Sequence, residues 1–165
     1  MARPIADLAD EESEYFFSRD YLCAVLEDGT VEIAGYYGTE TDLLIPDALD
    51  GRIVTAIGDH TFVNFGSLVT VTIPDSVTSI DTYAFYRCSS LTSVSIPDGV
   101  TSIGDSAFFG CKSLTSIVIP HSVTGIGNKA FHGCLSLTLT VTPDSCAEQY
   151  CVDNSIPYTY PDAAD

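Results

Sequence analysis

The sequence has little positive charge and no long apolar run. Only six lysine and arginine residues stand against 23 aspartate and glutamate residues, which gives a net charge of −17. The phosphate backbone of a nucleic acid repels such a chain, so we do not expect nucleic acid as a partner. No segment has the continuous apolar length that a membrane-spanning helix needs, so we expect no direct insertion into a membrane.

The sequence also lacks the compact motifs of enzymes and metal sites. It contains no glycine-rich phosphate-binding loop, zinc-protease motif, EF-hand loop or Cys-x-x-Cys pair. None of its three histidines has a serine, cysteine or glutamate at a spacing that brings a nucleophile and a base together. We therefore predict a protein that is not an enzyme and needs no cofactor and no metal.

Negative charge is concentrated at the two ends of the chain. Residues 1–50 hold 13 acidic and two basic side chains, residues 137–165 hold five acidic and no basic ones, and the region between them is nearly neutral. We interpret the acidic ends as caps that keep the protein soluble, with attraction to basic partners or cations as the alternative. Six of the acidic residues fall in the first 20 positions, where no apolar run follows a basic start, so this segment does not predict a secretory signal. The chain is then either cytoplasmic or a trimmed piece of a longer protein.

The chain repeats itself with a period of 23 residues, in consecutive units at 68–90, 91–113 and 114–136. A unit this short cannot bury its own apolar face, so neighbouring units must stack and share a core, which predicts a solenoid. A degenerate first coil at 44–67 carries a five-residue insertion around Asp50-Gly51, which we expect to lengthen one loop.

Within each unit, the spacing predicts two short strands and one helical turn. Val94 and Ile96 alternate with small polar residues, as in a half-buried strand. Residues 100–103 predict a second strand, and Gly104 then supplies a turn. Residues 105–111 have apolar side chains spaced to point inward from one turn of helix.

Residues one period apart should form columns along the solenoid axis. One column holds an aromatic residue in every coil and predicts a stacked core: Phe62, Phe85, Phe108 and Phe131.

Another column holds thiols: Cys88, Cys111 and Cys134. We predict that these cysteines are small buried groups that form weak hydrogen bonds with the loops. Zinc is disfavoured because ligands in a line do not form a tetrahedron. We expect mostly reduced cysteines, since Cys146 and Cys151 fit one helical face poorly and Cys23 could pair with one of them only if the two ends met.

Both ends of the array carry capping patterns. The strand-like segments 21–26 and 31–36, joined through Asp28-Gly29, predict a β-hairpin. After a last strand at 137–142, a capping box at 145–148 predicts a short helix to about Val152, and residues 158–160 predict a final strand. The predicted organisation is an acidic lead at 1–20, a hairpin cap at 21–43, the repeat array at 44–136 and a C-terminal cap at 137–165.

Two kinds of exposed column are candidate binding surfaces. Small hydroxyl residues and one valine face out from the first strand of each coil: Thr70, Thr72, Ser93, Ser95, Ser116 and Val118. A second column follows the core phenylalanine: Tyr86, Phe109 and His132. Aromatic residues are favoured anchors at interfaces, so the second column predicts a contact stripe. The structural alternatives are that the hydroxyl residues merely suit strands facing water and that the aromatic residues pack over neighbouring turns.

The repeated unit, Leu-x-x-Val/Ile-x-Ile-Pro-x-x-Val-Thr-x-Ile-Gly-x-x-Ala-Phe-x-x-Cys, resembles the BspA-like leucine-rich repeat. The match is strong from about Leu44 to Leu137, with departures at Phe65, Asp81 and His121. The resemblance implies a right-handed, curved leucine-rich repeat solenoid with short parallel strands. It also implies adhesion or protein binding on microbial cell surfaces and no catalytic residues.

These observations predict a non-catalytic binding module that uses a repeated solenoid face. Its partner would be a protein or a surface glycan, and we favour a monomer. The resemblance implies placement at the cell surface or secretion, although the sequence shows no signal peptide. The alternative is a structural spacer or a scaffold whose ends associate with each other.

Overall fold

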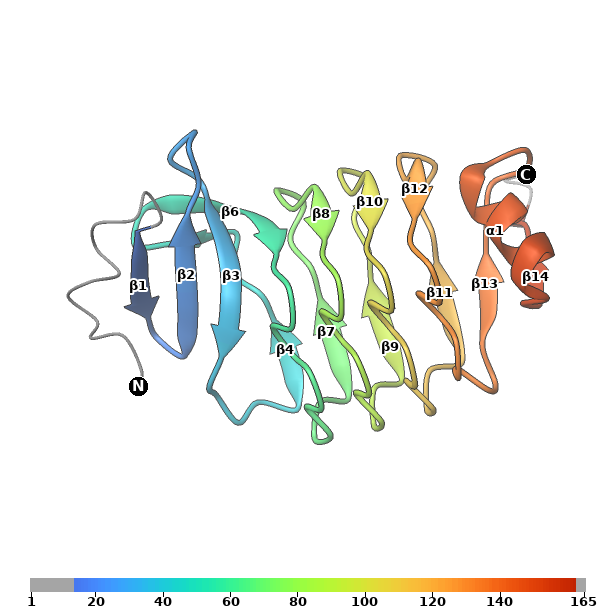
Figure 1. Ribbon diagram of the computed structural model, residues 1–165, viewed down its shortest axis with the longest axis horizontal. Coiled ribbons are helices and arrows are strands. Elements are labelled where there is room, and N and C mark those ends of the chain that lie inside the picture. The colour runs from blue at the N-terminus through green and yellow to red at the C-terminus, as the bar shows by residue number, and fades with distance from the viewer. Residues whose placement is uncertain (1–13, 163–165) are drawn as a thin grey trace.

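The computed structural model describes residues 14–162 of the chain as an elongated solenoid (Figure 1). The strands β1 and β14 lie at opposite ends of the molecule. Residues 1–13, which make up most of the acidic lead predicted at 1–20, lie outside the described residues. In the described part, no helix has the length and apolar character needed to span a membrane.

An antiparallel group of strands covers the N-terminal end. Strand β2 (Tyr21–Val25) pairs with β3 (Val31–Tyr36), as the hairpin prediction required. Gly29 makes the turn with a φ of 83°, a backbone conformation that glycine adopts without steric cost. The strand β1 (Tyr15–Ser18) adds to β2 within the segment that the sequence suggested only as an acidic lead.

The insertion in the first coil forms a second hairpin. We expected a longer loop there, but β5 (Ala48–Leu49) pairs with the start of β6 (Arg52–Ile57). Asp50 and Gly51 occupy the turn with φ values of 49° and 78°, as a type I′ turn requires. Because β6 also pairs in parallel with β3, this hairpin joins the N-terminal cap to the repeats.

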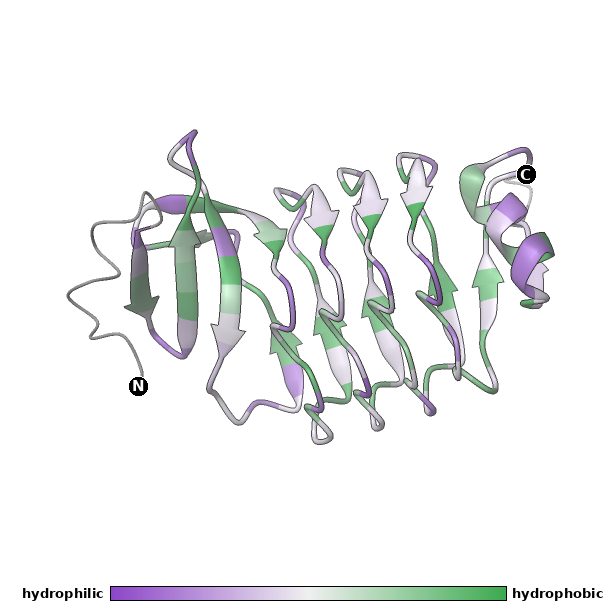
Figure 2. Cartoon of the chain, viewed as in Figure 1, coloured by the Kyte–Doolittle hydropathy of each residue, from purple (hydrophilic) through white to green (hydrophobic). Residues whose placement is uncertain are grey.

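Each repeat contributes a first and a second short strand to parallel ladders, and the first strands of the coils fall into two separate three-stranded sheets. The first strands of successive coils are β4 (Asp42–Leu44), β7 (Thr70–Thr72), β9 (Ser93–Ser95), β11 (Ser116–Val118) and β13 (Thr138–Thr140). The second strands are β8 (Ser79–Ile80), β10 (Ser102–Ile103) and β12 (Gly125–Ile126). The register is one period: Ser102 pairs with Ser79 on one side and with Gly125 on the other. Apolar residues therefore recur at the same place in β8, β10 and β12 (Figure 2).

The third side of each coil is a series of turns, where we had predicted one helical turn. We call this side the turn ribbon; it comprises residues 58–65, 81–88, 104–111 and 127–134. In the third coil the N–H groups of residues 107, 109 and 111 donate to carbonyls three residues back, at 3.1–3.3 Å. The intervening N–H groups of residues 106, 108 and 110 instead donate to carbonyls of the next coil, at 2.8–2.9 Å. A helical turn is wrong here because half of its backbone donors bond between coils.

Left-handed backbone makes this alternation possible. Ser106 and Gly110 have φ values of 54° and 71°, which turn every second N–H group along the solenoid axis. Gly104, expected to supply a turn, has no such φ. A Cβ atom on Gly104 would lie 2.5 Å from the amide nitrogen of Thr82, so the close approach of the preceding coil requires glycine there.

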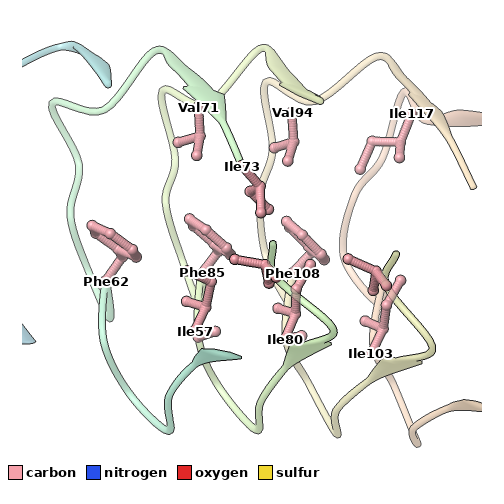
Figure 3. Close-up of a cluster of buried hydrophobic side chains, with 14 of the residues drawn as sticks. Ile57, Phe62, Val71, Ile73, Ile80, Phe85, Val94, Ile103, Phe108 and Ile117 are labelled. Atoms are coloured by element: carbon pink, nitrogen blue, oxygen red, sulfur yellow. The ribbon is translucent and has the colours of Figure 1, made fainter. Parts of the chain in front are cut away.

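The core consists of columns that run along the axis (Figure 3). The predicted phenylalanine column is confirmed: the four rings are buried and stack with centroid separations of 5.0, 5.1 and 5.3 Å and interplanar angles of at most 7°. Columns of β-branched residues flank the rings on two sides, with Val71, Val94 and Ile117 on one side and Ile57, Ile80 and Ile103 on the other.

The cysteine column also behaves as predicted. The Sγ atoms of Cys88, Cys111 and Cys134 donate hydrogen bonds of 3.0–3.1 Å to phenylalanine carbonyls of the preceding coil. Burial raises the pKa of Cys88 to about 12, so this thiol stays protonated at neutral pH. All six cysteines are free thiols; Cys23 lies in β2 of the N-terminal cap, and Cys151 lies in the C-terminal helix.

The predicted C-terminal cap is confirmed in its elements. The helix α1 (Cys146–Asn154) begins after Ser145, whose side chain accepts the Glu148 N–H, while the Glu148 carboxylate accepts the Asp144 N–H at 2.6 Å. The strand β14 (Tyr158–Thr159) then pairs in parallel with β13. Together they cover the last coil, since the ring of Tyr150 meets the ring of Phe131 edge-on at 6.0 Å.

Candidate functional site

The structure brings Tyr86, Phe109 and His132 together on the outer side of the turn ribbon. We call these three residues the aromatic stripe. The rings of Tyr86 and Phe109 stack with their centroids 5.0 Å apart, and the ring of His132 is tilted against that of Phe109 with centroids 5.2 Å apart. Tyr86 and Phe109 are half-buried, and His132 is exposed. The stripe is therefore continuous across three coils, and each residue packs over its neighbours while keeping part of its ring in contact with solvent.

Three further residues extend the aromatic stripe, and the sequence analysis missed them. Tyr83 meets Tyr86 edge-on at 5.3 Å, His60 lies 4.8 Å from Tyr83, and the guanidinium of Arg87 lies 5.3 Å from the Tyr86 ring centre. Tyr83 and Arg87 are four positions apart in the chain, and both have left-handed φ values. His60 and Tyr83 are one period apart, so the 23-residue spacing indicates their contact, whereas the column of Arg87 holds Asn64, Gly110 and Gly133 and gives no such signal.

A shallow groove runs beside the stripe across four successive coils. We call it the stripe groove; its volume is about 670 Å³, and it is open along its length. Its lining comprises Asn64, Gly66, Arg87, Ser89, Phe109, Gly110, Lys112, His132, Gly133 and Leu135. The hollow exists because three of these positions are glycines, which have no side chain to fill it. Leu135 is 82% exposed and forms an apolar wall at one end.

The charge of the stripe groove is opposite to that of the chain. Its lining contains Arg87 and Lys112 and no aspartate or glutamate, in a chain of net charge −17. Between residues 14 and 162, neither of these two cations forms an ion pair with a carboxylate. Both charges are thus available to a ligand.

The hydroxyl columns lie on a different side of the coil from the aromatic stripe. They project from β7, β9 and β11, where Thr70 is half-buried and the other five members are exposed. Thr70 donates a hydrogen bond of 2.8 Å to Asp42, and Val118 is 60% exposed. The structure therefore does not join the two sequence-predicted surfaces into one site.

Acidic groups gather where the first two segments of the turn ribbon begin. Glu32 is half-buried and close to Asp59 and Asp81; burial, together with these two carboxylates, raises the pKa of Glu32. No group of three or more histidine, cysteine or acidic side chains within residues 14–162 is arranged to hold a metal ion.

The repeat pattern and the fold are both similar to known leucine-rich repeat proteins. A sequence model of the BspA type leucine rich repeat region matches residues 48–156 in six copies. No curated protein matches the chain.

Solved structures show the same similarity. A leucine-rich repeat protein from Bacteroides capillosus is 30% identical, with a TM-score of 0.71 over 78% of this chain and 98% of that one. A leucine rich repeat protein of T. pallidum is 26% identical, with a TM-score of 0.62 over 77% of this chain and 71% of that one. A leucine rich cell surface protein from Faecalibacterium prausnitzii is 26% identical, with a TM-score of 0.56 over 78% of this chain and 54% of that one.

Proposed function

The chain belongs to the BspA-type leucine-rich repeat family, and we propose that it is accordingly a non-catalytic binding module whose partner is a protein. Modules of this kind present preformed side chains on a rigid repeated scaffold, so little conformational freedom is lost when the partner binds. One similar structure is that of a cell surface protein, which supports a place for this chain at the cell surface too.

The binding surface that we propose is the aromatic stripe with its groove. The observation that carries this choice is the continuous contact of Tyr86, Phe109 and His132, with Phe109 and His132 also lining a hollow. Aromatic side chains in a partly enclosed setting are the usual anchors of protein interfaces. The hydroxyl columns offer only short side chains, so we assign them a secondary role at most.

The test is affinity capture of proteins from an extract of surface-exposed proteins, quantified by mass spectrometry. We expect Phe109→Ser to reduce the recovery of captured partners at least about tenfold, as loss of a central anchor should. The matched control is Ser95→Ala, which changes an exposed residue on the strand side and should leave recovery unchanged. Far-UV circular dichroism shows whether each variant is folded; undiminished capture by a folded Phe109→Ser protein rules out the stripe.

A second candidate function is end-to-end association of the solenoid as a scaffold. It is supported by exposed aromatic side chains at the N-terminal end, where Phe17 and Tyr37 are 66% and 67% exposed and their rings lie 5.8 Å apart. The acidic ends oppose this association at low salt. Light scattering at increasing salt distinguishes the two candidates, because a constant monomer mass contradicts the scaffold.

A further inference from the structure

We propose that the stripe groove binds an acidic amphipathic helix of a partner protein, laid along the solenoid axis with about one helical turn over each coil. This inference rests on the function proposed above, because it names the partner chemistry of the same surface. Three properties carry it: the sign of the charge in the groove, the side of each ring that the adjoining aromatic stripe presents, and the spacing of those rings.

The charge of the groove favours an anionic partner. Arg87 and Lys112 are exposed and line the hollow, and no acidic residue lines it. Elsewhere the chain is strongly acidic, so an anionic segment meets attraction here and repulsion at the two ends. The charge of the groove therefore determines both the sign of the partner's charge and the place where the partner binds.

The orientation of the rings favours a peptide over a glycan. Tyr86 and Phe109 stack with an interplanar angle of 17°, and His132 covers the other side of Phe109 at 32°. Because these rings cover one another's faces, the stripe presents mainly ring edges to a ligand. Ring edges carry the positive part of the aromatic quadrupole, which suits carboxylates and aliphatic side chains. A sugar that must stack on an open ring face finds none at Phe109.

The spacing of the rings favours a helix over an extended strand. Successive rings are 5.0 and 5.2 Å apart. An α-helix advances about 5.4 Å per turn, so side chains one turn apart stay close to register with the coils. Side chains on one face of an extended strand repeat at about 6.7 Å and lose register within two coils. The hollow crosses three coil intervals, which corresponds to about ten residues of helix.

The side chains of the groove then assign roles to the two faces of such a helix. Apolar side chains on successive turns would lie over Phe109 and against the exposed Leu135. Acidic side chains on the flank would meet Lys112 and Arg87. The absent side chains at Gly66, Gly110 and Gly133 leave the room that the helix needs between them.

The probe for the test is a synthetic peptide of about 18 residues, long enough to form a helix when bound. Its leucines repeat at i, i+4, i+7 and i+11, and glutamates occupy both flanks. Binding to the full chain is followed by fluorescence anisotropy and by the gain of helical circular dichroism. The double variant Arg87→Glu and Lys112→Glu removes the groove's cations. The matched control is Arg52→Glu with Lys129→Glu, which makes the same change in net charge at positions that do not line the groove.

We expect the groove variant to weaken peptide binding at least about tenfold and the control variant to change it less than about twofold. Added salt should weaken wild-type binding, and the groove variant should not weaken binding of a peptide with lysine in place of every glutamate. The inference is overturned if the peptide does not bind, if both double variants bind it alike, or if the groove variant weakens binding of the lysine peptide as much as that of the glutamate peptide. It is also overturned if oligogalacturonate, an anionic glycan, binds in preference to the peptide. If the peptide fails while partner capture still depends on Phe109, the binding function stands and only the helical, acidic partner is wrong.

Discussion

Two glycines in the turn ribbon are required by the backbone of the neighbouring coil. A Cβ atom on Gly104 would lie 2.5 Å from the Thr82 amide nitrogen, and one on Gly127 would lie 2.4 Å from the Asp105 amide nitrogen. Both obstacles are backbone atoms of residues whose carbonyls accept hydrogen bonds from the preceding coil, Thr82 from His60 and Asp105 from Tyr83. Glycine is therefore a packing requirement here and not a matter of turn conformation.

This requirement gives a direct test at a single residue. We expect Gly104→Ala to lower the free energy of unfolding by about 3 kcal/mol, because two coils must move apart. Gly125→Ala is the control, since a Cβ there meets no atom within 4 Å and the residue has no left-handed φ. The free energy of unfolding of the Gly125→Ala variant should stay within about 0.5 kcal/mol of the wild-type value. Urea denaturation measures both, and equal stabilities would contradict the close approach.

Glu32 makes stability depend on pH. Burial and the nearby Asp81 and Asp59 carboxylates raise its pKa above the ordinary value of 4.5. The folded state therefore holds the proton at pH values where the unfolded state has released it, and stability falls as the pH rises from about 4.5 through the raised pKa. Above the raised pKa, Glu32 is ionised in the folded state, and the full loss of stability is present.

We therefore expect Glu32→Gln to raise the melting temperature at pH 7 and to give a smaller gain below pH 4.5. Thermal unfolding across this range measures the difference. Asp28→Asn is a useful contrast, because hydrogen bonds from Thr30 lower the pKa of Asp28 and its substitution should not stabilise the protein. A gain for Glu32→Gln that is the same at every pH would rule out titration as the cause.

At the scale of the element, the turn ribbon holds both the core and the candidate site. Phe108 points into the core, and the next residue, Phe109, points to the stripe groove. Two adjacent aromatic residues thus serve opposite sides of one backbone segment, whose amides bond alternately within and between coils. Substitution of Phe108 should therefore affect mainly stability, and substitution of Phe109 should affect mainly binding.

We expect Phe108→Ala to cost about 3–5 kcal/mol of unfolding free energy, since it leaves a cavity between two stacked rings. Phe109→Ser removes a half-buried ring and should cost clearly less. Chemical denaturation of the two variants checks the order. Equal losses would show that the stripe is part of the core and would weaken the case for a binding surface.

The elements also show why sequence reasoning succeeded in part. The 23-residue period was enough to predict the columns, because residues at one position of the repeat must stack. The column that begins at Phe62 and ends at Phe131 does so. The helical turn was wrong because the spacing of Ala107, Phe108 and Cys111 fits a helix, while its donors bond to a coil 22 residues away. The Asp50-Gly51 hairpin was missed although its signal was the one used for Asp28-Gly29. The stripe groove was not predicted: Gly110 and Gly133 lie one period apart, but the hollow also includes Gly66, which the period places in a different column.

At the scale of the whole molecule, each coil contacts mainly its neighbours, so coils of matching surface should be interchangeable. Residues 91–113 carry Gly104 where the preceding coil approaches, whereas residues 68–90 carry Asp81 at the same position. A second copy of 91–113 can stack on the first as the native next coil does. A second copy of 68–90 would place the Asp81 Cβ against backbone.

We expect a chain with residues 91–113 duplicated to fold and to melt at a temperature at least as high as the wild type, because it gains a coil and an interface. Duplication of residues 68–90 adds the same length and should lower the melting temperature. Replacing the second Asp81 with glycine should restore it. Circular dichroism follows all three chains, and identical melting of the two duplications would contradict the role given to this position.

The stacking of coils through nearest neighbours alone also determines how the molecule responds to force. A pull on the C-terminus acts first on β14 and α1, and then on coils whose contacts lie only with the coil before them. Each coil that detaches releases 23 residues, or about 75 Å of extended chain, in place of roughly 5 Å of solenoid. A protein anchored at one end and bound to a partner at the other would lengthen in steps, one coil at a time. Each step would absorb mechanical work before the complex with the partner dissociated.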